Sequence, residues 1–224
     1  MKELLYIETS PRKTRSASIE VAGAFINEVT RIHPACHVTT LNPWTMQLPE
    51  LSQDMLDAKY AGINGVPLSA AQQTAWDEVR RIAAPFHAAD HIVLAMPLWN
   101  FGIPYKLKHL IDVVSHKDVL FRFDASGLSG MLQTRRATVV CARGLDYPLG
   151  KDGSAHALDF QLPYIETWLR FIGVQEVRSV VVEKTLMGPE VDAGARAGAK
   201  RRAVELAEGL RGPKSGAVAG ACGA

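Results

Sequence analysis

Five short strand-like runs, separated by segments with helical spacing, restrict the fold more than any other feature of this sequence. The runs are residues 4–8, 37–41, 91–96, 137–142 and 177–182, and each has the usual length of a β-strand. Residues 91–96 and 137–142 are predominantly apolar along their whole length, which predicts strands that are buried on both faces.

The intervening segments predict helices near residues 16–29, 69–89, 104–114, 158–172 and 191–210. Ser69 and Gln72 form a capping-box pattern, Pro104 suits a first helical turn, and Gly173 suits a C-terminal cap. Strands that alternate with helices form a parallel sheet with right-handed crossovers and helices on both faces. We therefore predict an α/β protein with a doubly wound five-stranded parallel sheet, although periodicity alone does not fix the strand order.

One domain is expected over residues 1–211, with a loop-rich insertion at 44–67 and an unstructured Gly/Ala-rich tail at 212–224.

The net charge of +2 and the absence of a Lys/Arg run argue against a nucleic-acid partner. Cys36, Cys141 and Cys222 lie far apart without metal-ligand spacing, so neither a disulfide framework nor a metal site is expected. No apolar segment approaches the length of a membrane span, and the N-terminal residues lack the apolar stretch and the cleavage site of a signal peptide. We therefore expect a cytoplasmic protein with no membrane partner.

Both common strand orders of doubly wound sheets place ligands beyond the carboxyl ends of the strands. The loop after the first strand reads TSPRKTRSAS and leads into a helix. Hydroxyls, cationic side chains and the free N–H groups of a helix start suit a phosphate. The dinucleotide glycine pattern is absent, which favours a single terminal phosphate over a pyrophosphate. An ordinary polar loop with a Ser cap explains the same residues equally well.

The loop after the third strand reads PLWNFGIP and joins two aromatic residues to an Asn between two prolines. Flat side chains and a rigid backbone beyond a strand are suited to holding a planar ring. The alternative is a loop that simply packs under its neighbours. We favour the binding interpretation because loops usually stay on the surface and carry function.

Three segments, ETSPRKTRSAS, MPLWNFGIPYKLKHLID and VLFRFDASGLSG, make the chain resemble the FMN-dependent NADH azoreductases and related NAD(P)H:quinone oxidoreductases of flavodoxin-like fold. The resemblance implies an FMN cofactor, NADH or NADPH as reductant, and quinone or azo substrates reduced by two-electron ping-pong transfer. A flavodoxin-type electron carrier and a general NAD(P)H:FMN reductase are the alternatives. Electron carriers of that type tend to be shorter and acidic, whereas this chain is longer and mildly basic.

The resemblance also implies which residues hold FMN. The phosphate would bind at Ser10, Ser16, Ala17 and Ser18, with Arg12 nearby, and the flavin ring would lie against Pro97, Leu98, Trp99, Asn100 and Phe101 and against Ala142, Arg143, Gly144 and Leu145. The last loop departs from the Ser-Arg-Gly-Gly that is common in the family, since it has Ala142 and Leu145 at the first and last positions.

The segment Val119–Phe123 places two Phe residues in a connection near the ligand end of the sheet. In a monomer they would expose an apolar patch of the kind that marks interfaces and binding clefts. Family members pair so that aromatic side chains of one subunit help to cover the flavin of the other. The resemblance therefore implies a homodimer, with Phe121 over the substrate cavity and Arg122 nearby.

Overall fold

The computed structural model describes residues 1–134, 136–154 and 156–210. Its main sheet has five parallel strands in the order β2-β1-β3-β6-β7. These strands are β1 (Glu3–Glu8), β2 (His37–Leu41), β3 (His91–Pro97), β6 (Arg136–Ala142) and β7 (Glu176–Val182). All five predicted strands are confirmed to within two residues. The order, which periodicity left open, is the flavodoxin-like one.

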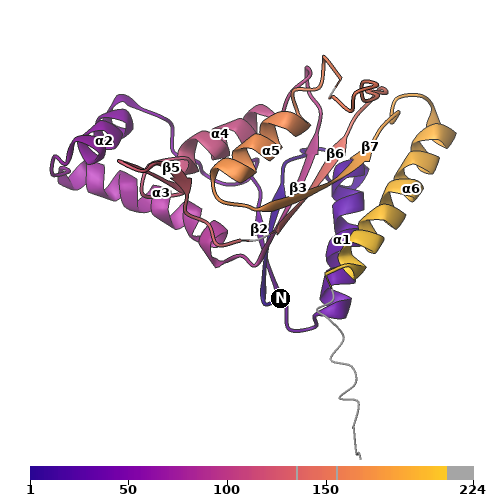
Figure 1. Cartoon of the computed structure of the whole chain (residues 1–224), viewed down its shortest axis with the longest axis horizontal. Helices are drawn as coiled ribbons and strands as arrows, with labels where there is room; N and C mark the ends of the chain where they lie inside the picture. The colour runs from indigo at the N-terminus through magenta and orange to yellow at the C-terminus, as the bar shows by residue number, and fades with distance from the viewer. Residues whose placement is uncertain (135, 155, 211–224) are drawn as a thin grey trace, which may run out of the picture.

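Helices cover both faces of this sheet (Figure 1). On one face lie α1 (Ala17–Ile32) and α6 (Pro189–Glu208), and on the other lie α3 (Ala70–Ala88), α4 (Tyr105–Val114) and α5 (Leu162–Phe171). Successive residues of a strand point to opposite faces. Along β3, Val93 and Ala95 therefore pack toward α1, while Leu94 and Met96 pack into the larger core on the other face. The expected doubly wound architecture is confirmed.

Local signals predicted several helix ends correctly. Ser69 and Gln72 form the complete capping box at the start of α3, and Gly173, which follows the C-cap residue Ile172 of α5, has a positive φ of 115°. The predicted start of α5 at residue 158 was wrong, because the helix begins at Leu162. The Asp159 carboxylate accepts hydrogen bonds from the N–H groups of Gln161 and Leu162 and so caps the helix from the preceding turn.

One helix and one two-stranded hairpin were not predicted. Helix α2 (Gln53–Asn64) lies within the segment expected to be a loop-rich insertion, capped by Ser52 and ended by Gly65 at a φ of 68°. Strands β4 (Phe121–Asp124) and β5 (Gly127–Gly130) form an antiparallel hairpin on the same side of the sheet as α3 and α5. The proposed tail, residues 212–224, lies outside the described residues. Within the described part of the chain, no helix combines the length and apolar character that crossing a membrane requires.

Candidate functional site

The three loops selected from the sequence follow adjacent strands and meet at one edge of the sheet. The N–H of Thr9, directly after β1, donates to the carbonyl of Ala95 in β3 over 3.0 Å. The N–H of Leu98, after β3, donates to the carbonyl of Ala142 at the end of β6 over 2.7 Å. The structure thus brings together the 10–18, 97–104 and 142–145 segments, which are far apart in the sequence.

The first loop carries buried hydroxyl groups at the start of α1. Ser10, Ser16 and Ser18 are all at most 4% exposed. The Ser16 Oγ lies 3.1 Å from the Ser18 Oγ and also accepts the N–H of Ile19 as the helix cap. The first N–H groups of a helix, here those of Ala17 and Ser18, have no acceptor within the helix. Buried hydroxyls beside free N–H groups at the positive end of a helix dipole fit a phosphate.

The basic residues of this loop lie on its solvent side, whereas its Ser hydroxyls are buried. Residues 13–15 form the short 3₁₀ helix η1 (Lys13–Arg15), and Arg12 and Arg15 are both exposed. Lys13 forms a 2.6 Å ion pair with Glu8. The loop therefore presents hydroxyls from inside and guanidinium groups from the solvent side.

The second loop is a tight turn with unusual backbone angles. Trp99 and Gly102 exchange two backbone hydrogen bonds of 3.1 and 2.9 Å across it. The two central residues, Asn100 and Phe101, have positive φ values of 47° and 70°. Positive φ is uncommon for a non-glycine residue and unfavourable for a bulky one, and such strained residues cluster at ligand-binding sites. The turn thus fixes the backbone around Asn100 and Phe101, and the ring of Phe101 is exposed.

The third loop presents mainly backbone, because its charged side chain points inward. The Arg143 guanidinium is 4% exposed and pairs with Asp159 at 2.5 Å and Glu183 at 3.2 Å. A Cβ on Gly144 would lie 2.6 Å from the Cδ1 of Leu186, so this position needs Gly or a shifted Leu186. Leu145 has 52% of its surface exposed.

Sequence reasoning missed Trp44, which joins two of the loops. Its indole N–H donates to the carbonyl of Thr9 over 2.8 Å. Its ring meets Trp99 and Tyr105 edge-on at centroid distances of 5.7 and 5.3 Å. A Trp in a loop after Asn42-Pro43 carries no local signal of this role, because its partners come from the loops after β1 and β3 and from the start of α4.

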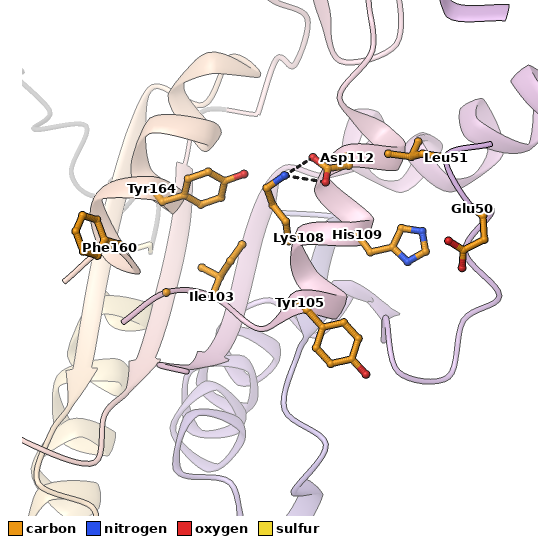
Figure 2. A pocket seen from close by; sticks show the side chains of 10 residues that line it. Glu50, Leu51, Ile103, Tyr105, Lys108, His109, Asp112, Phe160 and Tyr164 are labelled. Atoms are coloured by element: carbon orange, nitrogen blue, oxygen red, sulfur yellow. Dashed lines mark hydrogen bonds and ion pairs between the residues drawn. The ribbon is translucent and has the colours of Figure 1, made fainter. Parts of the chain in front are cut away.

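A cavity of about 650 Å³ opens beside the second loop, within the size range of small-molecule sites. Figure 2 shows Lys108 and Asp112 of α4 as an ion pair, with the ring of Tyr164 from α5 pointing toward it. The Lys108 Nζ lies 2.6 and 2.7 Å from the two carboxylate oxygens of Asp112. The remaining lining residues are Glu50, Leu51, Gly102, Ile103, Tyr105, His109 and Phe160.

Two polar side chains of this cavity, Lys108 and Tyr164, are hydrogen-bond donors at neutral pH, whereas the carboxylates of Glu50 and Asp112 are acceptors. The hydrogen bond to Asp112 raises the pKa of Lys108, so the ammonium form is favoured. Burial raises the pKa of Tyr164, so its hydroxyl keeps the proton. Apolar and aromatic walls with an ammonium and a phenol suit a flat ligand that carries hydrogen-bond acceptors.

The structure places Phe121 and Arg122 apart from this cavity within one chain. The Phe121 ring packs 4.9 Å from the ring of Phe171 at the end of α5, and Arg122 is exposed on the hairpin. Neither belongs to the cavity lining given above for the described residues. Phe123 and Leu128 face each other across the hairpin and are 63% and 57% exposed.

Comparison with known proteins agrees with this geometry. The model of a family described as having a flavodoxin-like fold matches residues 2–207. The chain belongs to this family. A protein of Pseudomonas fluorescens, named FMN-dependent NADH:quinone oxidoreductase 3, is 49% identical over 211 residues, covering 94% of this chain and 98% of the relative. FMN-dependent NADH:quinone oxidoreductase 9 of Burkholderia lata is 51% identical over 189 residues, covering 84% of this chain and 90% of the relative.

A solved structure extends the comparison to a flavin complex. The FMN-dependent NADH-azoreductase of Bacillus anthracis, in complex with FMN, superposes with a TM-score of 0.78 at 25% identity. The match covers 92% of this chain and all of that one. The resemblance stated from the three sequence segments is therefore confirmed at the level of family and fold.

Proposed function

We propose that this flavodoxin-like family member is an FMN-dependent NADH:quinone oxidoreductase. The observation that carries the proposal is the convergence of three ligand-binding loops at the carboxyl ends of β1, β3 and β6. Two relatives at about half identity have this activity in their names. Those names specify NADH, which we adopt as the reductant.

The residues fit an FMN in two parts. We assign the phosphate to the buried hydroxyls of Ser10, Ser16 and Ser18 and the N–H groups of Ala17 and Ser18, with Arg12 outside. We assign the flavin ring to the loop backbones at Pro97, Leu98, Trp99, Asn100 and Phe101 and at Ala142, Arg143, Gly144 and Leu145. When bound, FMN supplies two-electron redox chemistry, and the chain supplies binding and orientation.

The cavity of about 650 Å³ beside the second loop is our candidate for the substrate site. A quinone is flat and carries carbonyl acceptors, which the ammonium of Lys108 and the hydroxyl of Tyr164 can hydrogen-bond. An azo compound is also flat and carries nitrogen acceptors, so we include azo substrates in the proposal.

One site used in turn by reductant and substrate predicts ping-pong kinetics. Initial rates at several fixed quinone concentrations should give parallel double-reciprocal lines against NADH. Intersecting lines would show that both substrates occupy the enzyme together and would contradict this part of the proposal. A flavodoxin-type electron carrier would not turn over NADH with a small quinone, so the same assay separates the alternatives.

We further propose a homodimer in which the β4–β5 hairpin contacts the partner. Its cross-strand pair Phe123 and Leu128 is exposed on a two-stranded element, and apolar pairs of this kind commonly mark interfaces. Phe121 and Arg122 would then reach the partner's cavity rather than their own. Light scattering should give about twice the chain mass of 24.4 kDa. A fully active monomer would refute the homodimer proposal.

The cytoplasmic location expected from the sequence also stays a prediction.

The cofactor itself is tested by release from the purified protein. Heat denaturation followed by mass analysis should yield FMN, as the single-phosphate loop and the missing dinucleotide glycines predict. FAD as the main species would contradict the phosphate-loop assignment.

A further inference from the structure

The Arg143 guanidinium occupies a buried position where four segments of the chain meet. It follows β6, and its backbone N–H donates to the carbonyl of Val182 at the end of β7 over 2.8 Å. Its side chain is only 4% exposed. Burying a charge is costly unless it is paired and hydrogen-bonded, so its partners must be held in place.

Three side chains accept hydrogen bonds from different nitrogens of this guanidinium. Nη2 donates to Asp159 over 2.5 Å, Nη1 donates to Glu183 over 3.2 Å, and Nε reaches the amide oxygen of Gln161 at 3.4 Å. The guanidinium is planar and carries several N–H donors in fixed directions, so it can donate to all three acceptors at once. Lysine carries the same charge but not this geometry.

Each partner holds a different segment near the candidate flavin site. Asp159 caps the start of α5, and Glu183 also accepts the N–H of Tyr147 over 3.2 Å. The amide nitrogen of Gln161 lies 3.5 Å from the carbonyl of Met96 near the end of β3. The guanidinium thus connects the ends of β3, β6 and β7 with the start of α5.

This connection leads directly to the strained turn of the second loop. Phe160 lies between Asp159 and Gln161, and its N–H donates to the carbonyl of Phe101 over 2.9 Å. A shift of Asp159 would therefore pull on Phe101, one of the two residues with positive φ. The carbonyl of Arg143 also accepts the N–H and the hydroxyl of Thr185, which fixes the third loop.

We propose that Arg143 is a positioning residue, whose guanidinium sets the relative placement of the 97–101 and 142–145 loops and thereby the affinity and environment of the flavin ring. The inference rests on the proposed function. It assigns to the Arg143 side chain an action through other residues, since the guanidinium is buried and donates to Asp159, Glu183 and Gln161. Arg143 can have this role because a buried ion pair can favour one arrangement of its partners over others.

The test compares Arg143→Met and Arg143→Lys with the control Arg136→Met. Arg136 stands at the opposite end of the same strand, is half exposed, and forms a 3.1 Å ion pair with Glu176. For each apoprotein, folding is checked by far-UV circular dichroism and urea unfolding. FMN affinity, the visible circular dichroism of bound flavin and its midpoint potential are then measured.

Arg143→Met should weaken FMN binding by about tenfold or more, which corresponds to the loss of at least one hydrogen bond. It should also alter the visible circular dichroism and the midpoint potential of the bound flavin. Arg143→Lys keeps the buried charge compensated and so keeps the fold, but it should restore the affinity and the flavin signals only in part. Arg136→Met should bind FMN like the unaltered protein.

Two results overturn the inference. One is a folded Arg143→Lys with unchanged affinity, flavin dichroism and potential. The other is a folded Arg143→Met with affinity within about twofold of the unaltered protein and unchanged signals. If Arg143→Met does not fold, Arg143→Lys alone decides. Failure of the proposed function is a separate outcome, because the unaltered protein would then bind no FMN.

Discussion

Replacing Ser18 with Ala removes one buried hydroxyl from the proposed phosphate site and leaves the cap of α1 in place. Ser18 is fully buried, and its hydroxyl lies 3.1 Å from that of Ser16. A hydrogen bond to a charged group contributes about 1.5–3 kcal/mol, and each 1.4 kcal/mol changes an affinity about tenfold. Ser18→Ala should therefore weaken FMN binding about 10- to 100-fold, with at most about 1 kcal/mol lost from apoprotein stability.

Ser16→Ala should act on both quantities, because the Ser16 oxygen is also the N-cap acceptor for Ile19. Loss of a Ser cap costs about 1 kcal/mol of stability. The variant should therefore weaken FMN binding by a similar factor and also lower the unfolding free energy of the apoprotein. The pair of variants separates phosphate binding from helix capping.

Titration of each apoprotein with FMN, followed by quenching of flavin fluorescence, gives the affinities. Urea unfolding of the same samples without FMN gives the stabilities. An unchanged FMN affinity in a variant that combines Ser16→Ala with Ser18→Ala, with the apoprotein still folded, would refute the assignment of the phosphate to this loop.

The remaining predictions concern pH, substrate and flavin environment. Burial lowers the pKa of His91 and of His116 from 6.5 to about 4. The unfolded chain then binds more protons between those values, so stability is lost as pH falls from about 6.5 toward 4, by about 2 kcal/mol per His between pH 7 and 5. Urea unfolding at pH 7 and pH 5 should show about half of the combined loss in His116→Phe, because only His91 then contributes. A loss equal to that of the unaltered protein would contradict the lowered pKa of His116. Phe121→Ala should raise KM for bulky quinones more than it weakens FMN binding in parallel kinetic and titration assays, and an unchanged KM would argue against its role at the partner's site. Leu145→Gly should shift the flavin spectrum and midpoint potential, and unchanged values would remove Leu145 from the ring environment.

The sheet could be predicted because its signals are local. Residues 91–96 are predominantly apolar and form the central strand β3, whose side chains reach both cores. The strand order could not be read from periodicity, since each run fits any position in a parallel sheet. Family resemblance supplied the flavodoxin-like order, and the pairing of β1 with both β2 and β3 confirms it.

The missed elements lack a strong local pattern. Helix α2 has little contrast between its faces, and its signals are a Ser52 cap and a Gly65 stop in a segment rich in other breakers. The two strands of the β4–β5 hairpin have only four residues each and are mostly exposed, so their sequences do not alternate clearly.

The candidate site could be predicted from the sequence only in part. The three loops follow strands and could be located, whereas the partners of their side chains are distant in sequence. Asp159 and Glu183 lie 16 and 40 residues from Arg143, and Trp44 lies 35 residues from its acceptor at Thr9. Only folding brings these groups together, so no spacing rule could have identified them.

An anaerobic half-reaction experiment tests the central claim most directly. The purified protein, loaded with FMN, is mixed with NADH in the absence of oxygen, and the visible flavin absorbance is recorded before and after one equivalent of a quinone is added. We predict that NADH bleaches the bound flavin and that the quinone restores it with one-to-one stoichiometry. A flavin that NADH leaves oxidised, or a reduced flavin that the quinone does not reoxidise, would contradict the assignment as an NADH:quinone oxidoreductase.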